Sequence, residues 1–301
     1  MALVTEHKGR RVLVAGWFSY PERWATAGDL MAKDVVCDWL DGTGIEHDVA
    51  LAPVFEGGVD LVDVIPEKYT DVFFVCGPMA DSDIVEDFLQ RFSGSSIWGI
   101  NLSMLKPLEN FNPFDVLLER DSSRTARPEL AMLCKRPLVP LTGVVLVHPQ
   151  KEYGKRARHA EADAAIGRLI DSQSTAAIPI DTCLDPNATG LRTAAEVESL
   201  IARMDVVMTT RLHGLILSIK NGVPAIAIDA ISKGAKVSRQ AKTIGWPLVF
   251  QVDDLRDDEL IKAFEYCLTP EAHRTVLECR DRARAALDDV RKEFYENMKQ
   301  G

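Results

Sequence analysis

Short apolar runs rich in β-branched residues alternate with longer helical patterns along most of this 301-residue chain. Several of the runs are apolar without strict alternation, as strands are when helices cover both faces of a parallel sheet. The pattern therefore predicts a doubly wound α/β fold. Ten runs have the length and composition of strands: 11–18, 47–53, 71–77, 95–103, 114–120, 143–149, 176–181, 205–210, 224–229 and 248–253.

The alternation is interrupted at "LCKRPLVPLTG" (133–143), where two prolines and a glycine separate two sets of strands. We place the domain boundary there and predict two Rossmann-like domains, residues 1–137 and 138–301. Ligands of such sheets bind at the carboxyl ends of the strands, so we expect the domains to face each other across a cleft. The C-terminal helix, 271–299, is expected to pack across both domains. The other helical patterns include 28–41, 82–92, 160–172, 193–203 and 211–221.

Composition excludes several classes of protein. A formal net charge of −10 argues against a nucleic-acid-binding protein, because such proteins need a basic surface. No apolar run reaches the roughly 18 residues that a membrane-spanning helix requires, and the N-terminus lacks a signal-peptide pattern. The six cysteines are scattered without a CxxC pair, so we expect reduced thiols in a cytoplasmic protein and no metal site. Peripheral membrane contact and a homo-oligomer stay open.

One segment of this acidic chain is basic. "HPQKEYGKRARH" (148–159) contains two lysines and two arginines. A local basic pocket for an anionic small molecule is compatible with an acidic protein. The alternative is a solvated start of a helix, since runs of charge usually face water.

The stretch "MDVVMTTRLHGLILSIKNGVPAIAID" places Arg211 and His213 between apolar runs. The first run predicts a buried strand. The residues after Arg211 repeat apolar positions at helical spacing, and "NGVP" supplies a helix end. Arg211 and His213 therefore lie between the carboxyl end of a parallel strand and the amino end of a helix, where Thr209 and Thr210 could cap the free N–H groups.

This position is suited to an anion. Free N–H groups point outward from the start of a helix, and Arg211 adds a planar fork of donors for carboxylate or phosphate. His213 can transfer a proton near neutral pH, and Gly214 would let a ligand approach the backbone. The structural alternative is that Arg211 forms an ion pair between domains and His213 is a hydrogen-bonded core residue.

The same segment resembles the C-terminal signature of the polysaccharide pyruvyl transferase family. That signature has an apolar strand, Arg-Leu-His, a helix, Gly-Val-Pro, a second strand and a later lysine. All of these stand here in "TTRLHGLILSIKNGVPAIAIDAISKGAKV". The family's lysine-valine before a helix matches Lys236 rather than Lys233. The resemblance is specific over about 190–248.

Weaker similarities follow in the same order nearer the N-terminus. "AGDLMAKDVVCDWL" resembles the family's Gly-Asp motif, with Gly28 and Asp29, and "ERDSSRTARPEL" (119–130) is similar to its Arg-Asp motif. Two positions depart from the family pattern. The glycine-rich turn after the third strand is reduced to Gly77, and His148 stands where the family often has arginine.

The resemblance implies an enzyme that transfers pyruvate from phosphoenolpyruvate to two hydroxyls of a sugar-containing acceptor, forming a ketal and releasing phosphate. It implies a phosphoenolpyruvate site in the C-terminal domain and an acceptor site in the N-terminal domain. Arg211 and Lys236 would bind the donor, His213 would be the acid/base, and Asp29 would assist. Gly28, Gly77, His148, Thr210 and Gly214 are further candidates for substrate contact. No redox cofactor or metal is implied.

Two other functions remain open from the sequence. A glycosyltransferase of the GT-B type, which uses a nucleotide sugar, has the same two-domain architecture, and fold does not fix chemistry. The residues after Arg211 show no clear acidic partner for a ribose. The second alternative is a non-catalytic relative that binds a sugar or a protein, favoured only by the reduced glycine-rich turn.

Overall fold

The computed structural model describes residues 9–300. Its contacts divide the chain into two compact units, Met1–Arg136 and Pro137–Gly301. The division falls inside the proline-containing segment 133–143. Each unit is an α/β structure and is described by itself.

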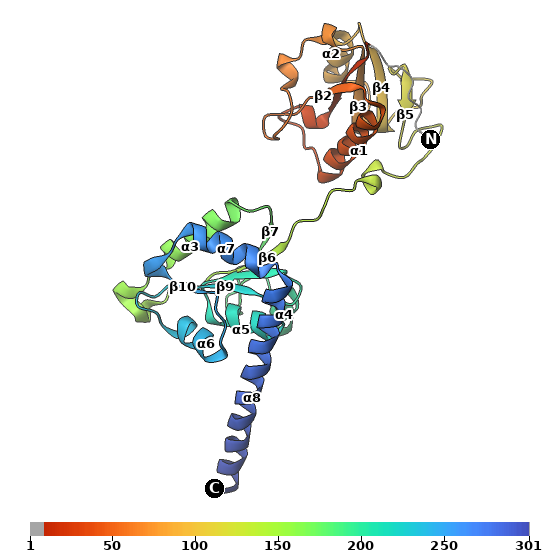
Figure 1. Ribbon diagram of the computed structural model, residues 1–301. Coiled ribbons are helices and arrows are strands. Elements are labelled where there is room, and N and C mark those ends of the chain that lie inside the picture. The colour runs from red at the N-terminus through yellow and green to blue at the C-terminus, as the bar shows by residue number, and fades with distance from the viewer. Residues whose placement is uncertain (1–8, 301) are drawn as a thin grey trace. The chain divides into compact units, whose positions relative to one another are not determined.

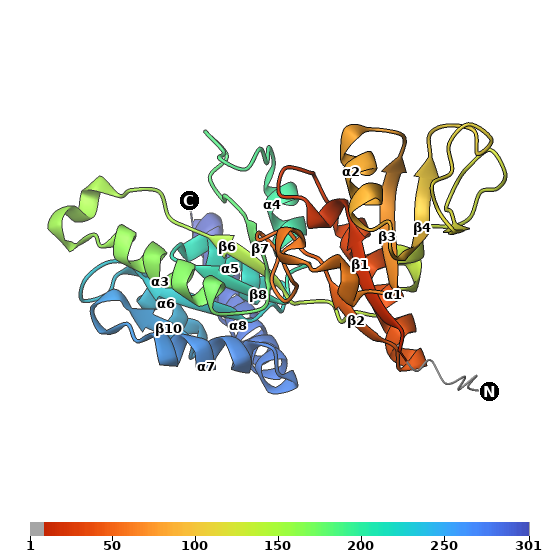
Figure 2. The same ribbon diagram turned by 90° about the horizontal axis from the view of Figure 1, so that it is seen from above.

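The first unit contains a five-stranded sheet in the order β2-β1-β3-β4-β5, with all neighbouring strands parallel. Figure 2 shows β1, β3 and β4 side by side. The strands are β1 (Arg11–Gly16), β2 (Glu46–Val49), β3 (Asp71–Met79), β4 (Ser96–Met104) and β5 (Val116–Leu118).

Two α-helices cover opposite faces of this sheet, α1 (Ala27–Thr43) and α2 (Asp83–Arg91). Alternate residues of β1 enter different cores. Leu13 packs in the cluster that contains Val85 and Phe88 of α2, whereas Val12 packs in the cluster that contains residues of α1. The strands are therefore buried on both sides, as their continuous apolar runs predict. Short 3-10 helices complete the unit: η1 (Trp17–Ser19), η2 (Leu61–Asp63), η3 (Pro66–Lys68) and η4 (Leu130–Leu133).

The second unit repeats the plan with the sheet order β10-β9-β8-β6-β7, again parallel throughout. Its strands are β6 (Leu141–Val145), β7 (Ala176–Pro179), β8 (Val206–Thr209), β9 (Ala225–Asp229) and β10 (Val249–Gln251). Its helices are α3 (His159–Asp171), α4 (Ala194–Ile201), α5 (Leu212–Lys220), α6 (Lys236–Ile244), α7 (Asp257–Cys267) and α8 (Pro270–Gln300), with 3-10 helices η5 (Lys151–Arg156) and η6 (Val252–Asp254).

The helices of the second unit lie on both faces of its sheet (Figure 1). Apolar residues of α3 and α7 form one core, and those of α4, α5, α6 and the first part of α8 form the other. Beyond residue 283, the side chains of α8 are exposed up to residue 299. None of the helices within residues 9–300 has both the length and the apolar character needed to cross a bilayer.

Both sheets have the same strand order when the strands are numbered within each unit, 2-1-3-4-5. The order reverses between the first and third strands, which are β1 and β3 in one unit and β6 and β8 in the other. Loops leave such a pair in opposite directions, so a crevice forms at the carboxyl ends of the strands, and ligands of doubly wound folds bind there. The topology therefore predicts a ligand site in each unit at the carboxyl ends of these two strands.

The structure confirms the predicted doubly wound α/β class and all ten predicted strands. It extends the C-terminal helix to Pro270–Gln300 and shows its first part packed on α5, α6 and α7. The cleft between the domains and the packing of this helix across both domains stay predictions.

Helix α5 packs very closely on the sheet at Gly214. A Cβ atom there would lie 2.2 Å from Oγ1 of Thr209 and 2.9 Å from Cγ1 of Val145. Both neighbours belong to buried strands, so they have little room to move. The absence of a side chain at Gly214 therefore serves the packing of α5 on the sheet, and contact of Gly214 with a ligand stays a prediction.

We expect Gly214→Ala to lower the free energy of unfolding of the second unit by about 1–3 kcal/mol, because it overpacks the strand–helix contact. The matched control is Gly28→Ala in α1, where the added Cβ would meet its nearest atom at 3.5 Å. That variant should be neutral or stabilising by up to about 1 kcal/mol. Urea unfolding read by pulsed hydrogen exchange resolves peptides from each unit; equal effects of the two changes would contradict the packing argument.

Candidate functional site

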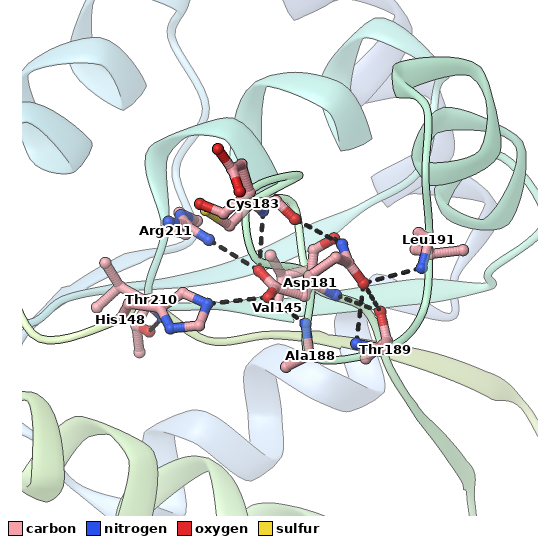
Figure 3. A network of polar contacts seen from close by, with 12 residues as sticks. Val145, His148, Asp181, Cys183, Ala188, Thr189, Leu191, Thr210 and Arg211 are labelled. Atoms are coloured by element: carbon pink, nitrogen blue, oxygen red, sulfur yellow. Dashed lines mark hydrogen bonds and ion pairs between the residues drawn. The ribbon is translucent and has the colours of Figure 1, made fainter.

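Polar side chains gather around Asp181 at the carboxyl edge of the second sheet (Figure 3). Asp181 follows β7, His148 follows β6, and Arg211 follows β8 as the N-cap residue of α5. These three strands are neighbours in the sheet, and the site includes the point between β6 and β8 where the strand order reverses. Arg211 and His148 both point toward Asp181 (Figure 3).

The Asp181 carboxylate is buried, with a side-chain exposure of 6%, and it accepts four hydrogen bonds. Backbone N–H groups of Cys183 and Ala188 donate at 2.8 and 2.9 Å. Burial alone would raise the pKa of Asp181, but these two bonds and His148 outweigh it and hold the pKa below its usual value. Asp181 is therefore an anion at neutral pH.

Arg211 is fixed by this carboxylate. Its Nη1 lies 3.1 Å from Oδ1 of Asp181, and its side chain is 19% exposed. The backbone N–H of Arg211 donates to Oγ1 of Thr209 at 2.9 Å, which holds the chain at the turn between strand and helix. One nitrogen of the guanidinium is thus bound to Asp181, and within residues 9–300 Nε and Nη2 form no hydrogen bond, so their edge is available to a ligand. That edge is the fork that binds carboxylate or phosphate with two hydrogen bonds.

His148 is oriented by the other oxygen of the same carboxylate. Its Nε2 lies 2.9 Å from Oδ2 of Asp181, and its side chain is 47% exposed. Since an ionised carboxylate can only accept, Nε2 carries the proton and Nδ1 of the neutral ring is left as an acceptor. An aspartate that fixes the tautomer and orientation of a histidine is a common device in acid/base catalysis. Sequence reasoning named His148 only as a candidate for substrate contact and did not predict its hydrogen bond to Asp181.

The loop that follows Asp181 is organised by Asn187. Its side-chain N–H groups donate to the carbonyl groups of Asp181 and Cys183, and its side-chain oxygen accepts from the backbone of Thr189 and Leu191. These bonds bring the N–H of Ala188 to the carboxylate of Asp181. The loop is therefore part of the support of the site.

A cavity of about 320 Å³ opens beside this network. His148, Asp181 and Thr189 supply its polar groups, and residues of β6, of β7 and of the turns after them supply apolar walls. Arg211 is not among its lining residues. It is connected to the cavity by its ion pair with Asp181, which lines it. The volume falls in the range of about 300–1,000 Å³ that is usual for small-molecule sites.

The other predicted donor-site residues occupy the same edge of the sheet. His213 is exposed in the first turn of α5, so it is not the core residue of the structural alternative. Lys236 is the first residue of α6 and is partly exposed. Helices α5 and α6 begin after the neighbouring strands β8 and β9, which places both side chains near the carboxyl ends of those strands.

Thr209 and Thr210 do not form the cap that the sequence predicted, while substrate contact by Thr210 stays a prediction. No side chain caps the start of α5. The hydroxyl of Thr210 is buried and accepts a hydrogen bond of 2.8 Å from the N–H of Val147, and Oγ1 of Thr209 lies 2.9 Å from the carbonyl oxygen of Val145. Both threonines therefore hold the end of β6, from which His148 extends, and leave the helix start uncapped.

The two arginines of the basic segment 148–159 form hydrogen bonds and ion pairs with neighbouring parts of the second unit. Arg156 donates to the carbonyl groups of Ser232 and Gly234, at 2.9 and 3.1 Å from its Nη2. Arg158 forms ion pairs with Glu161 and Asp253. Arg156 thus fastens the segment after His148 to the loop before Lys236, so two loops at this edge of the sheet are joined.

The remaining predicted residues lie in the first unit. Asp29 and Gly77 line one cavity of about 390 Å³. Gly28 lies in the first turn of α1 and is not among the lining residues. Arg120 also lines this cavity, while its guanidinium pairs with Asp121 and Glu129.

Two important residues were missed by sequence reasoning. Asp181 ends the predicted strand 176–181, and an acidic residue at that place in a parallel strand is the same signal that drew attention to Arg211. Trp24 was not distinguished from the other tryptophans. Its exposure of 97% is a property of the folded chain that no local pattern reveals.

Strand order and site position together define a doubly wound α/β protein with a charged site at the switch point of its second sheet. Comparison with known proteins identifies the related family. Residues 168–230 match the polysaccharide pyruvyl transferase family, which confirms the resemblance and supports a transferase. The matched region contains Asp181, Arg211 and His213 and ends before Lys236. No curated protein matches the sequence.

Solved structures that align with the chain are distant. They include a spinosyn rhamnosyltransferase, SpnG, complexed with thymidine diphosphate, at 12% identity, 91% coverage of this chain and 96% of that chain, and a TM-score of 0.35. UDP-GlcNAc 2-epimerase from Methanocaldococcus jannaschii aligns at 12% identity, with coverage of 95% and 99% and a TM-score of 0.34. MurG from Acinetobacter baumannii aligns at 10%, with coverage of 94% and 99% and a TM-score of 0.31. The fold assignment rests on the strand order and not on these alignments.

Within residues 9–300, no three His, Cys, Asp or Glu side chains come together in a group that could hold a metal ion. The ligand-facing candidates of this site are instead the cationic Arg211 and Lys236 and the two histidines, His148 and His213.

We expect Asp181→Asn to lower the stability of the second unit at pH 7 by about 1–3 kcal/mol, because an amide cannot replace all the acceptors of the carboxylate. The pKa of Asp181 is lowered in the folded state, so its contribution is full above the unfolded pKa of about 4 and is lost as pH falls through the folded pKa. The difference between wild type and variant should therefore shrink below pH 4.

Urea unfolding at pH 7, 5 and 3, followed by a hydrogen-exchange pulse at one fixed pH, measures this difference in peptides from residues 141–229. The control is Asp171→Asn, at the end of α3 outside the network. A difference that grows as the pH falls would contradict the assigned direction of the pKa shift.

Proposed function

We propose that this protein transfers pyruvate from phosphoenolpyruvate to two hydroxyls of a sugar-containing acceptor, giving a cyclic ketal and phosphate. The observation that carries the proposal is Arg211, held by buried Asp181 with an open guanidinium edge, inside the region that matches the pyruvyl transferase family. Phosphoenolpyruvate carries a carboxylate and a phosphate, and both are anions that an arginine fork binds well.

The donor is held by groups at the carboxyl edge of the second sheet. Arg211 offers Nε and Nη2 to one anionic group, and the uncapped N–H groups at the start of α5 add positive partial charge. Lys236 at the start of α6 contacts the second anionic group. The two helix starts follow neighbouring strands, so one small dianion can engage both.

The reaction needs balanced proton transfers and no redox step. A proton added to the methylene carbon of phosphoenolpyruvate makes C2 electrophilic, and the first sugar hydroxyl forms a C–O bond to C2. The C2–O bond to phosphate then breaks, and the second hydroxyl attacks C2 to close the ketal ring. Of the two protons lost by the hydroxyls, one balances the proton on the methylene carbon and the other leaves with phosphate.

Two histidines of the site divide the proton transfers. We assign His213 to the proton on the methylene carbon, since it stands in the first turn of α5 beside Arg211. His148, whose Nε2–H is held by Asp181, takes up a hydroxyl proton at its free Nδ1. Asp29 in the first unit has the role of a helper on the acceptor side. The protein needs no resident cofactor for these steps.

We expect Arg211→Ala to raise the KM for phosphoenolpyruvate by about tenfold to a hundredfold, because it removes a charged hydrogen-bonding fork. His213→Ala should instead lower kcat by about a hundredfold or more with a smaller change in KM. Steady-state phosphate release with phosphoenolpyruvate and a panel of sugar acceptors measures both values.

The control variants are Arg192→Ala and His273→Ala, which remove an exposed arginine and an exposed histidine of the second unit away from the site. Both should keep the kinetics of the wild type. An unchanged KM in Arg211→Ala, or the opposite split between the two variants, would reverse the assigned roles.

A ligand screen distinguishes this reaction from glycosyl transfer. Phosphoenolpyruvate at 100 times its Kd should stabilise the protein by about 2.7 kcal/mol, seen as a rise in Tm that Arg211→Ala reduces. Nucleoside diphosphates should give little or no rise. Stabilisation by nucleotides alone would contradict the proposed donor and favour a glycosyltransferase.

A further inference from the structure

The first unit has its own cavity at the corresponding place in its sheet. The cavity of about 390 Å³ lies at the carboxyl ends of β1 and β3, the pair between which the strand order reverses. Trp17 follows β1 directly, and Gly77 is near the end of β3. Topology therefore predicts a ligand here on the same grounds as in the second unit.

Trp17 forms a fixed wall of this cavity. Its indole Nε1 donates to the carbonyl oxygen of Pro78 at 3.0 Å, and its ring packs edge-on against Phe74 with centroids 5.3 Å apart. Gly77, with φ of +91°, allows this close approach, because a Cβ atom there would lie 2.3 Å from the indole ring. The single glycine left from the family's glycine-rich turn thus seats an aromatic ring.

A second tryptophan, Trp24, also lines this cavity, and its side chain is almost entirely exposed to solvent. Trp24 is 97% exposed, so residues 9–136 leave both faces of its ring open to solvent. Two indole rings thus line one cavity, and the exposed ring of Trp24 is available for a ligand to cover. Pyranose rings present C–H faces that stack on indole, so Trp24 and Trp17 provide apolar surfaces for a sugar.

The polar groups of the cavity match the substituents of a sugar. Oδ2 of Asp29 accepts the N–H and the hydroxyl of Thr26, at 2.7 and 2.9 Å, which fixes the carboxylate in a capping box. Its other oxygen, Oδ1, has no hydrogen-bond partner among residues 9–300 and can accept from a sugar hydroxyl. Asp29 is therefore both a helix-capping residue and a wall of the cavity.

Arg23 adds a positive charge to the cavity. Its guanidinium lies over the Trp17 ring, 5.4 Å from the centroid, and within residues 9–300 it forms no ion pair. By contrast, Arg120 in the same cavity is paired with Asp121 and Glu129. A guanidinium stacked on an aromatic ring keeps its N–H edge free for an anion.

We propose that this cavity binds a pyranoside carrying an anionic group, a phosphate or a carboxylate, with Arg23 as the residue that selects for the charge. The sugar ring stacks on the tryptophans, a hydroxyl donates to Asp29, and the anionic group lies at the edge of Arg23. Taking this sugar as the acceptor rests on the proposed pyruvyl transfer; the binding itself does not.

The test measures sugar binding to the full chain without phosphoenolpyruvate. The probes are sugar 1-phosphates and uronic acids of the gluco, galacto and manno series, with the methyl glycosides as neutral partners, titrated by calorimetry and saturation-transfer NMR. At least one anionic probe should bind about tenfold tighter than its neutral partner. Arg23→Ala should abolish that preference, whereas Trp24→Ala should weaken anionic and neutral sugars alike by about threefold to tenfold.

Both substituted side chains are exposed, so the variants should fold. Lys68→Ala, which removes an exposed positive charge elsewhere in the unit, and Trp39→Phe are the controls. The absence of millimolar binding by every anionic probe, or a preference that survives Arg23→Ala, would overturn the proposal. Arg211→Ala should leave sugar binding unchanged, so loss of phosphoenolpyruvate-dependent phosphate release with intact sugar binding would count against the proposed function alone.

Discussion

The candidate site depends on one buried carboxylate. Asp181 receives hydrogen bonds from Arg211, His148 and two backbone N–H groups, and these bonds keep it ionised although it is almost fully buried. A buried charge persists only where such partners compensate for the lost hydration. The same bonds that stabilise the anion therefore fix the direction of a cationic fork and the tautomer of a histidine. One hydrogen-bond network around Asp181 therefore both stabilises the fold and orients the groups that would act on a ligand.

The two units carry different chemical groups at equivalent positions of the same fold. Each has a parallel sheet of order 2-1-3-4-5, and each has a cavity where that order reverses. In the second unit the edge carries a cation, a histidine and an uncapped helix start, which suit a small anion. In the first unit it carries two tryptophans, the carboxylate of Asp29 and Arg23, which forms no ion pair within residues 9–300; the proposed site for a charged sugar rests on these groups.

Much of this could be predicted from local pattern. Continuous apolar runs gave all ten strands, because burial on both faces leaves no room for polar residues in the middle of a parallel strand. Arg211 and His213 stood out because they interrupt such runs. The side-chain cap predicted for the helix after Arg211 was wrong for a tertiary reason. Thr209 and Thr210 bond instead to Val145 and Val147, more than sixty residues away in the chain.

By itself, then, the sequence determined the class of fold, the position of Arg211 and His213 at a strand end, and the resemblance to the pyruvyl transferase family. These depend on the periodicity and order of residues along the chain. Only the tertiary structure decided that Asp181 is the centre of the site, that His148 is oriented by it, and that Trp24 is bare. Each of these depends on which strands are neighbours in the sheet or on what covers a side chain, and neither quantity is written in the spacing of residues.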